Sequence, residues 1–449
     1  MDCFSKLPPE LRIRIFSHFT STSTIFRLVQ ASPIMLSQYR VSETTIRRQY
    51  VVNLLAGDRH EDLLQDALGL LYLELSDKRP DNHVMKYIIR QWNSKSLPDP
   101  FLQKDQAAIA KLYKLFSSMS MFVEDYISKA TSSNPPQAYL CLPQIGDPNR
   151  GLYYKEHSFS PRHVTLDDLT SSERHHLIWA FIKYDMYYKI QAPKMKLLTG
   201  DNEHFFMCVK AFKELTNGDR EALSCVSDYV TAVYGALFTA STRCSTRHAS
   251  STLRDTPANP ARLLYPDNLY FSPLLAFDDM KLPSKCIRKY AIKLSVLGFD
   301  LLRDLVRFAN KAQPEDMRSW FYTIISHVER SDYLSLRHYR FPFFETSREI
   351  PVNRHDGSPR ALLVQRLFVA GIRNLNQGSV LSWHTLRLIF RQRAWIFLDD
   401  TRLLQKGLGH FPSMEDLEHH PLPERGLETM HAAEERQRLR HLQLCQYRR

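Results

Sequence analysis

Histidine and carboxylate side chains occur as adjacent pairs in this sequence, at a spacing that does not build metal or catalytic sites. The pairs are His175-His176, His419-His420, Asp167-Asp168, Asp278-Asp279 and Asp399-Asp400. Adjacent residues point to different sides of a helix, so the histidines cannot chelate a metal as an i, i+4 pair does. Acid pairs that lack a partner motif are typical of helix caps or solvated surface. We therefore expect no metal site and no catalytic carboxylate dyad.

The glycine motifs that bind phosphates or expose a nucleophile are missing from the sequence. Only 14 of the 449 residues are glycine, which is about 3% against a usual ~7%. None of the patterns G-x-x-x-x-G-K-[ST], G-x-G-x-x-G, G-x-S-x-G or H-E-x-x-H occurs. These absences predict a protein that is not an enzyme and that needs no cofactor.

Basic and aromatic residues alternate near residue 390, a combination that can grip phosphate and stack bases. Arg387 and Arg391 lie one helical turn apart, with Trp383, Phe390 and Arg393 nearby. No nucleic-acid-binding motif surrounds them, so we favour a solvated basic helix face above core-facing aromatic residues. We expect no nucleic-acid partner.

The charge balance is basic, with a formal net charge of +12, and part of the excess is local. Residues 1–50 contain seven basic and three acidic residues, and the last fourteen residues contain five arginines and no acid. A basic end can attract nucleic acid, anionic lipid or an acidic protein. A solvated tail is the simpler interpretation, and it is the one we favour.

Cysteine usage and hydropathy predict the compartment. The seven cysteines are scattered and form no C-x-x-C pair, as in reduced intracellular proteins. The N-terminus does not resemble a signal peptide, and no apolar run reaches the ~18 residues of a membrane span. We expect a cytoplasmic or nuclear protein without a membrane partner.

The apolar periodicity is helical throughout and predicts an all-α fold. Capping boxes stand at Asp58 with Glu61 and at Thr170 with Glu173. A short extended piece is expected around Trp395–Leu398. The spacing predicts helices over residues 103–130, 202–216, 219–241, 284–311, 314–330, 359–376 and 380–392.

Proline-rich stretches divide the helices into regions. We expect a small three-helix module over residues 1–50, a large irregular helical domain over 51–406, and a weakly ordered polar tail over 407–449. The domain contains proline-rich loops at 132–163 and 245–284. Such long loops are either disordered or drape over the helices, and their tyrosines favour draping.

The N-terminal module carries more apolar surface than it can bury itself. The prolines at 8 and 9 favour a helix start, and Leu11, Ile15 and Phe19 then share one helix face. A run of serine and threonine over residues 20–24 suits a loop and a cap before the second helix. Three short helices leave apolar side chains for the rest of the chain or for another protein to cover.

This segment resembles an F-box, in particular the degenerate F-boxes at the start of many fungal proteins. The matching residues are Leu7-Pro8-x-Glu10-Leu11, Ile15-Phe16-x-x-Phe19, Ile25-x-x-Leu28 and the small pair Ala31-Ser32. The family usually has a basic residue and a tryptophan after the small pair, where this chain has Pro33, Ile34 and Met35. The stretch Arg393–Asp399 also resembles a segment common near the C-terminus of such fungal proteins.

The resemblance implies a non-catalytic adaptor of an SCF-type (cullin–RING) ubiquitin ligase. The F-box would bind the Skp-type adaptor, and the remaining helical region would hold a protein substrate. The apolar anchors that the resemblance implies are Leu7, Pro8, Leu11, Ile15, Phe16, Ile25 and Leu28. The alternative is a helical scaffold whose vestigial F-box packs into its own core.

Overall fold

The computed structural model describes residues 2–58, 62–77, 82–131, 164–191, 215–240, 294–295, 297–309, 313–330 and 391–403, with three short strands between residues 146 and 158. The predicted helices at 359–376 and almost all of those at 202–216 and 380–392 lie outside the described residues. So do the proline-rich loop at 245–284, most of the loop at 132–163, and the tail from 407 onward.

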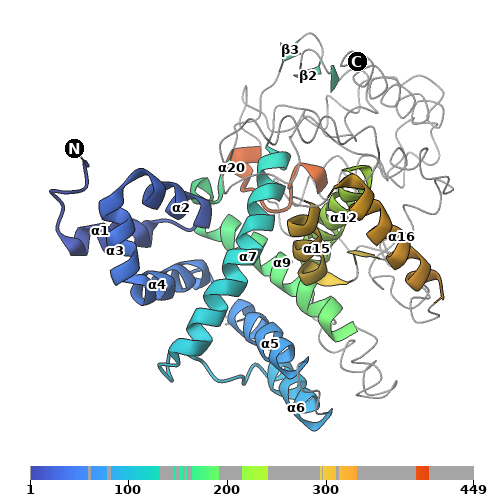
Figure 1. Cartoon of the computed structure of the whole chain (residues 1–449), viewed down its shortest axis with the longest axis horizontal. Coiled ribbons are helices and arrows are strands. Elements are labelled where there is room, and N and C mark those ends of the chain that lie inside the picture. Colours follow the sequence, from blue (N-terminus) through green and yellow to red (C-terminus); the bar gives the residue numbers. More distant parts are fainter. Residues whose placement is uncertain are drawn as a thin grey trace, which may run out of the picture.

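The fold is all-α, as the sequence predicts (Figure 1). The described helices are α1 (Pro9–His18), α2 (Thr22–Ala31), α3 (Pro33–Val41), α4 (Glu43–Leu55), α5 (Asp62–Asp77), α6 (Asn82–Asn93), α7 (Gln106–Ala130), the 3-10 turn η1 (Leu166–Asp168), α9 (Ser171–Gln191), α12 (Asn217–Ala240), α15 (Gly298–Ala309), α16 (Pro314–Arg330) and α20 (Asp400–Leu403). Strands β1 (Gly146–Asp147), β2 (Gly151–Tyr154) and β3 (His157–Ser158) pair antiparallel in that order.

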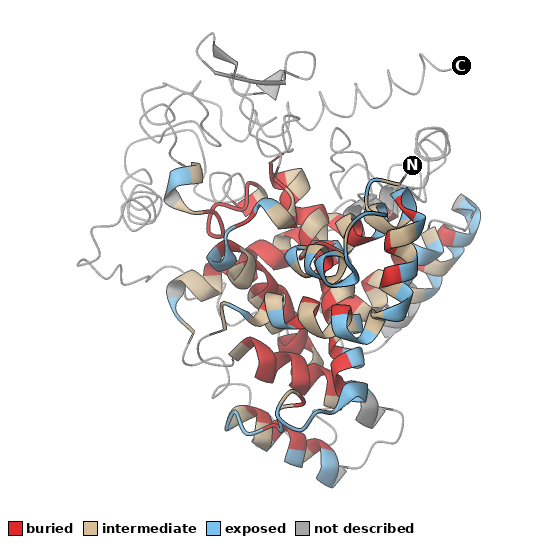
Figure 2. Cartoon of the chain, turned by 90° about the vertical axis from the view of Figure 1, so that its left-hand side faces the viewer, coloured by how far each residue is buried: buried red, intermediate tan, exposed pale blue. Residues whose placement is uncertain are grey.

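Helix α7 is the central element, and it contacts α4, α5 and α9 (Figure 1). Asp105 caps it by accepting a hydrogen bond from the Ala108 amide at 3.0 Å. The predicted apolar stripe is confirmed, because all its members are buried: Ile109, Leu112, Phe116, Met119, Val123, Tyr126 and Ile127. Buried residues are concentrated in the interior between the helices (Figure 2).

Local capping chemistry explains where two helices begin. The capping box before α9 is confirmed: the Thr170 amide donates to Glu173 Oε2 at 2.9 Å, and the Glu173 amide donates to Thr170 Oγ1 at 3.2 Å. Before α5, Asp58 accepts the Leu64 amide at 2.9 Å, but its expected partner Glu61 lies outside the described residues.

The predicted helix over 284–311 is confirmed for residues 298–309, but it is not continuous in its described part, because a turn at residue 297 precedes α15. Helix α15 begins only at Gly298, whose φ of +76° is left-handed. A Cβ on Gly298 would lie 2.6 Å from Oδ1 of Asp185 in α9, and the same oxygen accepts the Phe299 amide at 2.9 Å. A side chain from a distant helix therefore sets this start, which the periodicity of the segment itself cannot show.

Asp185 makes stability depend on pH. Burial, helped by the nearby Asp300, raises the pKa of Asp185 to about 6. The folded state then holds a proton that the unfolded state releases near pH 4, so this contribution to stability falls as pH rises from about 4 to about 6. We expect the stability of Asp185→Asn, which keeps an acceptor for the Phe299 amide, not to show this loss, which is about 3 kcal/mol between pH 4 and pH 7.5. Urea unfolding of both proteins across this range checks it, and parallel pH profiles would contradict it.

The N-terminal helices share one core with the rest of the protein. The predicted module boundary at residue 50 falls inside α4, which packs on α1 and on α7. Phe16, Ile25, Met35 and Ile46 belong to the same buried cluster as the body helices. Part of the leftover apolar surface is therefore covered by this chain itself.

Candidate protein-binding site

The start of α1 presents the residues of the LPPEL motif at the surface. Pro9 occupies the first helical position, where its missing N–H costs little. The Arg12 guanidinium donates from Nε to the Leu7 carbonyl at 2.9 Å and fixes the chain before the helix. Pro8 is exposed, and Leu11 exposes 45% of its surface. This end of α1 is available to another molecule.

The structure divides the seven anchors of the resemblance into two groups. Phe16 and Ile25 are buried in the protein's own core, with 1% and 3% exposure. The other five retain accessible surface: Pro8 and Leu11 are exposed, and Leu7, Ile15 and Leu28 are partly buried. Only this second group can contact a partner without unfolding the helices.

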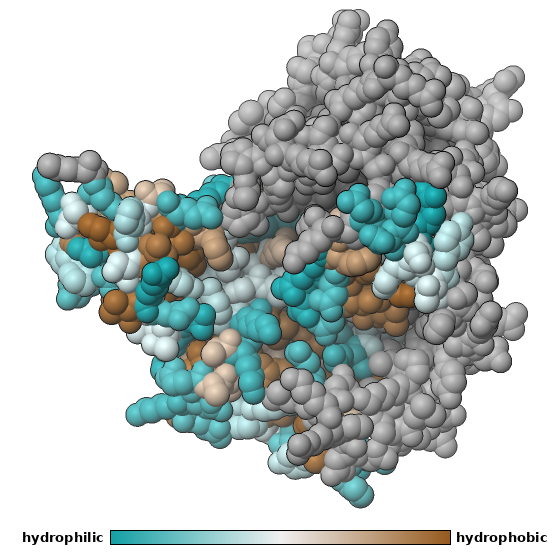
Figure 3. All heavy atoms as spheres, viewed as in Figure 1, coloured by the Kyte–Doolittle hydropathy of each residue, from teal (hydrophilic) through white to brown (hydrophobic). Residues whose placement is uncertain are grey.

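Four of these accessible residues follow one another along the start of α1 and define what we call the α1 ridge: Leu7, Pro8, Leu11 and Ile15. Leu11 and Ile15 are spaced by four, which places them on one side of α1, and Leu7 and Pro8 directly precede the helix. Hydrophobic residues gather at the surface of the N-terminal helices (Figure 3). Phe26, 55% exposed, lies on α2 and was not among the predicted anchors. Nothing in its sequence pattern distinguished it from a buried residue.

Charged groups near the ridge are mostly basic. Lys6, Arg14 and Arg40 are exposed, as is the motif acid Glu10, while Asp2 and Glu43 are engaged within the chain. Asp2 accepts the Ser32 hydroxyl at 2.5 Å, a hydrogen bond that lowers the pKa of Asp2. Glu43 pairs with Arg47 at 2.5 Å. The surroundings of the ridge therefore suit a partner with acidic groups.

Polar contacts join the N-terminal helices to the body through Asp167. Its Oδ1 accepts the Thr20 amide at 2.8 Å and the Ser21 amide at 3.0 Å, and its Oδ2 accepts the Thr24 hydroxyl at 2.7 Å. The predicted cap is confirmed, because the Ser21 hydroxyl accepts the Thr24 amide. A carboxylate at a helix N-terminus is favoured by the helix dipole. Asp167 therefore has the capping role predicted for the acid pairs, but the helix whose start it holds is the distant α2.

The basic cluster near residue 390 is buried, so the prediction of a solvated face is wrong for its described residues. Arg391 is 6% exposed and Arg393 is fully buried. The Arg391 guanidinium donates to Glu221 at 2.7 and 2.9 Å and to Asp228 at 3.0 Å. Trp383, Arg387 and Phe390 lie outside the described residues.

The environment of this cluster keeps Arg391 charged and keeps the neighbouring Cys225 thiol protonated. Burial alone would lower the pKa of Arg391, but the charges of Glu221 and Asp228 outweigh it and raise that pKa. Burial raises the pKa of the neighbouring Cys225 thiol, which disfavours the reactive thiolate. The cluster is a structural ion pair, and it offers no nucleophile.

Residues 393–398 form turns, so the predicted extended piece around Trp395–Leu398 is wrong. These turns are buried and tied to α7: Arg393 Nη1 donates to the Ala130 carbonyl at 2.9 Å, and the Tyr126 hydroxyl donates to the Arg391 carbonyl at 2.6 Å. The segment that resembles a common fungal C-terminal stretch therefore forms part of the core.

Histidines, cysteines and carboxylates do not gather into a metal site in the described part of the chain. Its residues contain no group of three or more histidines, cysteines or carboxylates that could hold a metal ion. Burial lowers the pKa of His175. The pairs His419-His420 and Asp278-Asp279 lie outside the described residues. Among the helices that are described, none has both the length and the apolar composition to cross a membrane.

Comparisons with protein-family models, with curated proteins and with solved structures gave no match. The case for a binding role therefore depends on the motif residues and on the geometry of the α1 ridge.

Proposed function

We propose that this chain is a substrate-recognition adaptor of an SCF-type ubiquitin ligase that binds a Skp-type adaptor through its N-terminal helices. The chain itself would do no chemistry. It would hold a protein substrate near the ubiquitin carrier and so raise the effective concentration of the substrate lysine. The helical body would supply the substrate surface.

The observation that carries this proposal is the exposure of the α1 ridge. Pro8 and Leu11 of the LPPEL motif face outward even though α1 packs on α3 and α4. A large apolar side chain at 45% exposure costs free energy in an isolated protein, because about 25 cal/mol is lost for each Å² of apolar surface left in water. Burial against a partner would recover it.

A second candidate is a non-catalytic helical scaffold whose vestigial F-box completes its own core. The burial of Phe16 and Ile25 favours this function, as do the hydrogen bonds that join α2 to Asp167. The two candidates differ in one measurable property, which is affinity for the Skp-type adaptor.

Truncation of the ridge should weaken binding without unfolding the protein. We expect Leu11→Ala to lower affinity for a purified Skp-type adaptor roughly 30-fold, because loss of a central apolar anchor costs about 2 kcal/mol. Titration calorimetry with the full chain measures this. Val41→Ala is the matched control, since Val41 is 81% exposed on α3 of the same module and lies outside the motif.

Two results would contradict the adaptor function. One is equal affinity of the Leu11→Ala and unchanged proteins, which would place any binding elsewhere. The other is the absence of measurable binding by the unchanged chain, which would support the scaffold function.

A further inference from the structure

Two segments that are far apart in the sequence, residues 20–24 and residue 402, meet at one 3-10 turn, η1. A capping box fixes the shape of this turn: the Thr165 amide donates to Asp168 Oδ2 at 2.9 Å, and the Thr165 hydroxyl donates to the same oxygen at 2.6 Å. Asp167, in the middle of η1, binds the N-terminal helices. The carbonyl of Asp168 accepts Arg402 Nη2 at 3.0 Å. One turn of chain therefore contacts both residues 20–24 and residue 402.

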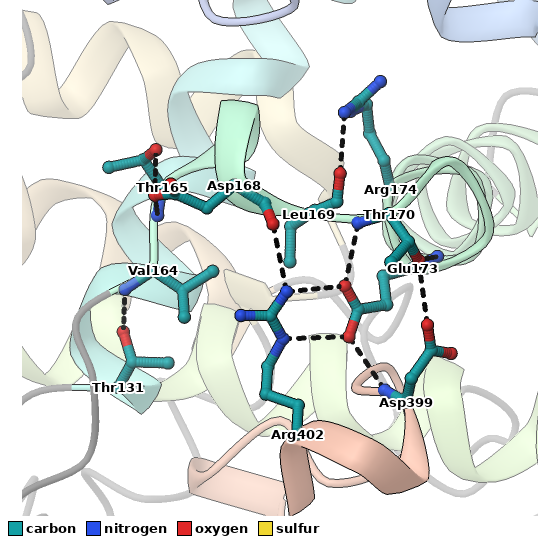
Figure 4. A network of polar contacts seen from close by, with 10 residues as sticks. All are labelled: Thr131, Val164, Thr165, Asp168, Leu169, Thr170, Glu173, Arg174, Asp399 and Arg402. Atoms are coloured by element: carbon teal, nitrogen blue, oxygen red, sulfur yellow. Dashed lines mark hydrogen bonds and ion pairs between the residues drawn. The ribbon is translucent and has the colours of Figure 1, made fainter.

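On the C-terminal side, Glu173 is the hub of the contacts (Figure 4). It is 1% exposed and accepts Arg402 Nε at 3.0 Å, Arg402 Nη2 at 3.2 Å, the Asp399 amide at 2.8 Å and the Thr170 amide at 2.9 Å. Burial alone would raise the pKa of Glu173, but the hydrogen bonds from Arg402 and from the two amides outweigh it and lower that pKa. Glu173 is thus a charged acceptor whose ionised form needs its partners.

The Arg402 side chain links that hub to η1, because its Nη2 donates both to Glu173 and to the Asp168 carbonyl. Arg174, the next residue of α9, adds a second tie by donating to the Leu166 and Leu169 carbonyls at 3.3 and 2.8 Å. Arg402 retains 25% exposure of its side chain. Solvent or another molecule can therefore reach Arg402, as it can reach the exposed Asp168 and Thr170.

On the N-terminal side, the contact with η1 is largely buried. Thr20 and Ser21 are 3% and 2% exposed, and Asp167 Oδ1 accepts both of their amides and the Thr20 hydroxyl. The neighbouring Ser23 hydroxyl donates to Glu124 of α7 at 2.6 Å. A shift of η1 would move the Asp167 carboxylate away from the start of α2, and the loop would lose the acceptor that its Thr20 and Ser21 amides share.

We propose that η1 is a joint through which residues 399–402 position the N-terminal helices against the body. The pathway runs from Arg402 through Glu173 and the Asp168 carbonyl to the Asp167 carboxylate and the start of α2. Any event that draws the Arg402 guanidinium away from Glu173 loosens α2. This inference does not depend on the adaptor function, because it concerns only how the chain holds its own module.

Hydrogen–deuterium exchange of the full chain tests the joint without any partner protein. Asp167→Ala is the direct reference, and we expect it to speed amide exchange in the peptide covering residues 20–24 at least tenfold. We expect Arg402→Ala, at the far end of the pathway, to speed exchange in that peptide about threefold or more. Arg402→Lys keeps a positive charge beside Glu173 but loses the guanidinium that donates through two nitrogens. It should speed exchange in the same peptide by a smaller factor.

The control is Arg307→Ala, which removes an exposed guanidinium from α15 and should leave residues 20–24 unchanged. Peptides from α6 report on global stability. If Arg402→Ala speeds exchange only in residues 166–173 and 399–403, there is no coupling and the joint is disproved. If all peptides, α6 included, loosen equally, Arg402 is a general stabilising residue and the joint is also disproved.

Discussion

Replacing Arg391 with alanine is expected to lower the free energy of unfolding by about 3 to 5 kcal/mol, because the change leaves a buried charge without its partner. Glu221, 4% exposed, accepts two hydrogen bonds from the guanidinium, and Asp228 accepts one. With Arg391 absent, the Glu221 carboxylate must either remain ionised in a low-dielectric environment or take up a proton. Urea denaturation at neutral pH measures the difference.

Two further variants show whether the loss of stability comes from leaving Glu221 charged and unpaired, or from removing an arginine from any position. Arg307→Ala removes an exposed guanidinium that lies 3.9 Å from Asp304, and it should change stability by less than about 0.5 kcal/mol. The double variant Arg391→Leu with Glu221→Leu removes both charges, so it should recover much of the loss seen with alanine. A small effect of Arg391→Ala would show that Glu221 reaches solvent when its partner is gone.

The same cluster shows why parts of the fold could not be predicted from sequence. The stripe of α7 and the box at Thr170 and Glu173 were predicted because their partners lie three or four residues apart. Arg391 was interpreted as solvated because its acidic partner Glu221 lies 170 positions away. The start of α15 could not be predicted for the same reason, since Asp185, which accepts the Phe299 amide there, lies 114 positions away. The local spacing of apolar residues predicts where helices lie. It does not predict which distant charged residue pairs with a given residue in the core.

In the candidate site, too, the sequence predicts local features but not those set by distant residues. The motif spacing predicted the start of α1 and the turn before α2, and both are observed. It could not predict which side of α1 the body covers, because that is decided by α3 and α4. Phe16 and Leu11 are therefore both apolar anchors of the motif, but in the structure Phe16 is buried and Leu11 is exposed. Asp167, the residue that fixes α2, has no signal within the N-terminal segment at all.

This division of the anchors leads to a prediction with a large effect on folding. Phe16→Ala should lower the free energy of unfolding by about 3 to 5 kcal/mol, the usual cost of deleting a buried phenyl ring. The ring is 1% exposed and packs edge-on against Tyr39, with 5.7 Å between ring centroids. Leu11→Ala should cost less than about 1 kcal/mol, because almost half of that side chain is already in water. Thermal or urea unfolding of the two variants compares them directly.

The comparison decides how any binding data on this module can be interpreted. A Phe16 variant that loses the Skp-type adaptor has also lost packing in the core, so its failure to bind does not identify an interface. A Leu11 variant that keeps its stability and loses the adaptor identifies a contact, because the helices that present the ridge are still formed. If Leu11→Ala instead destabilises the protein as much as Phe16→Ala, Leu11 is part of the core and the α1 ridge is not a docking surface.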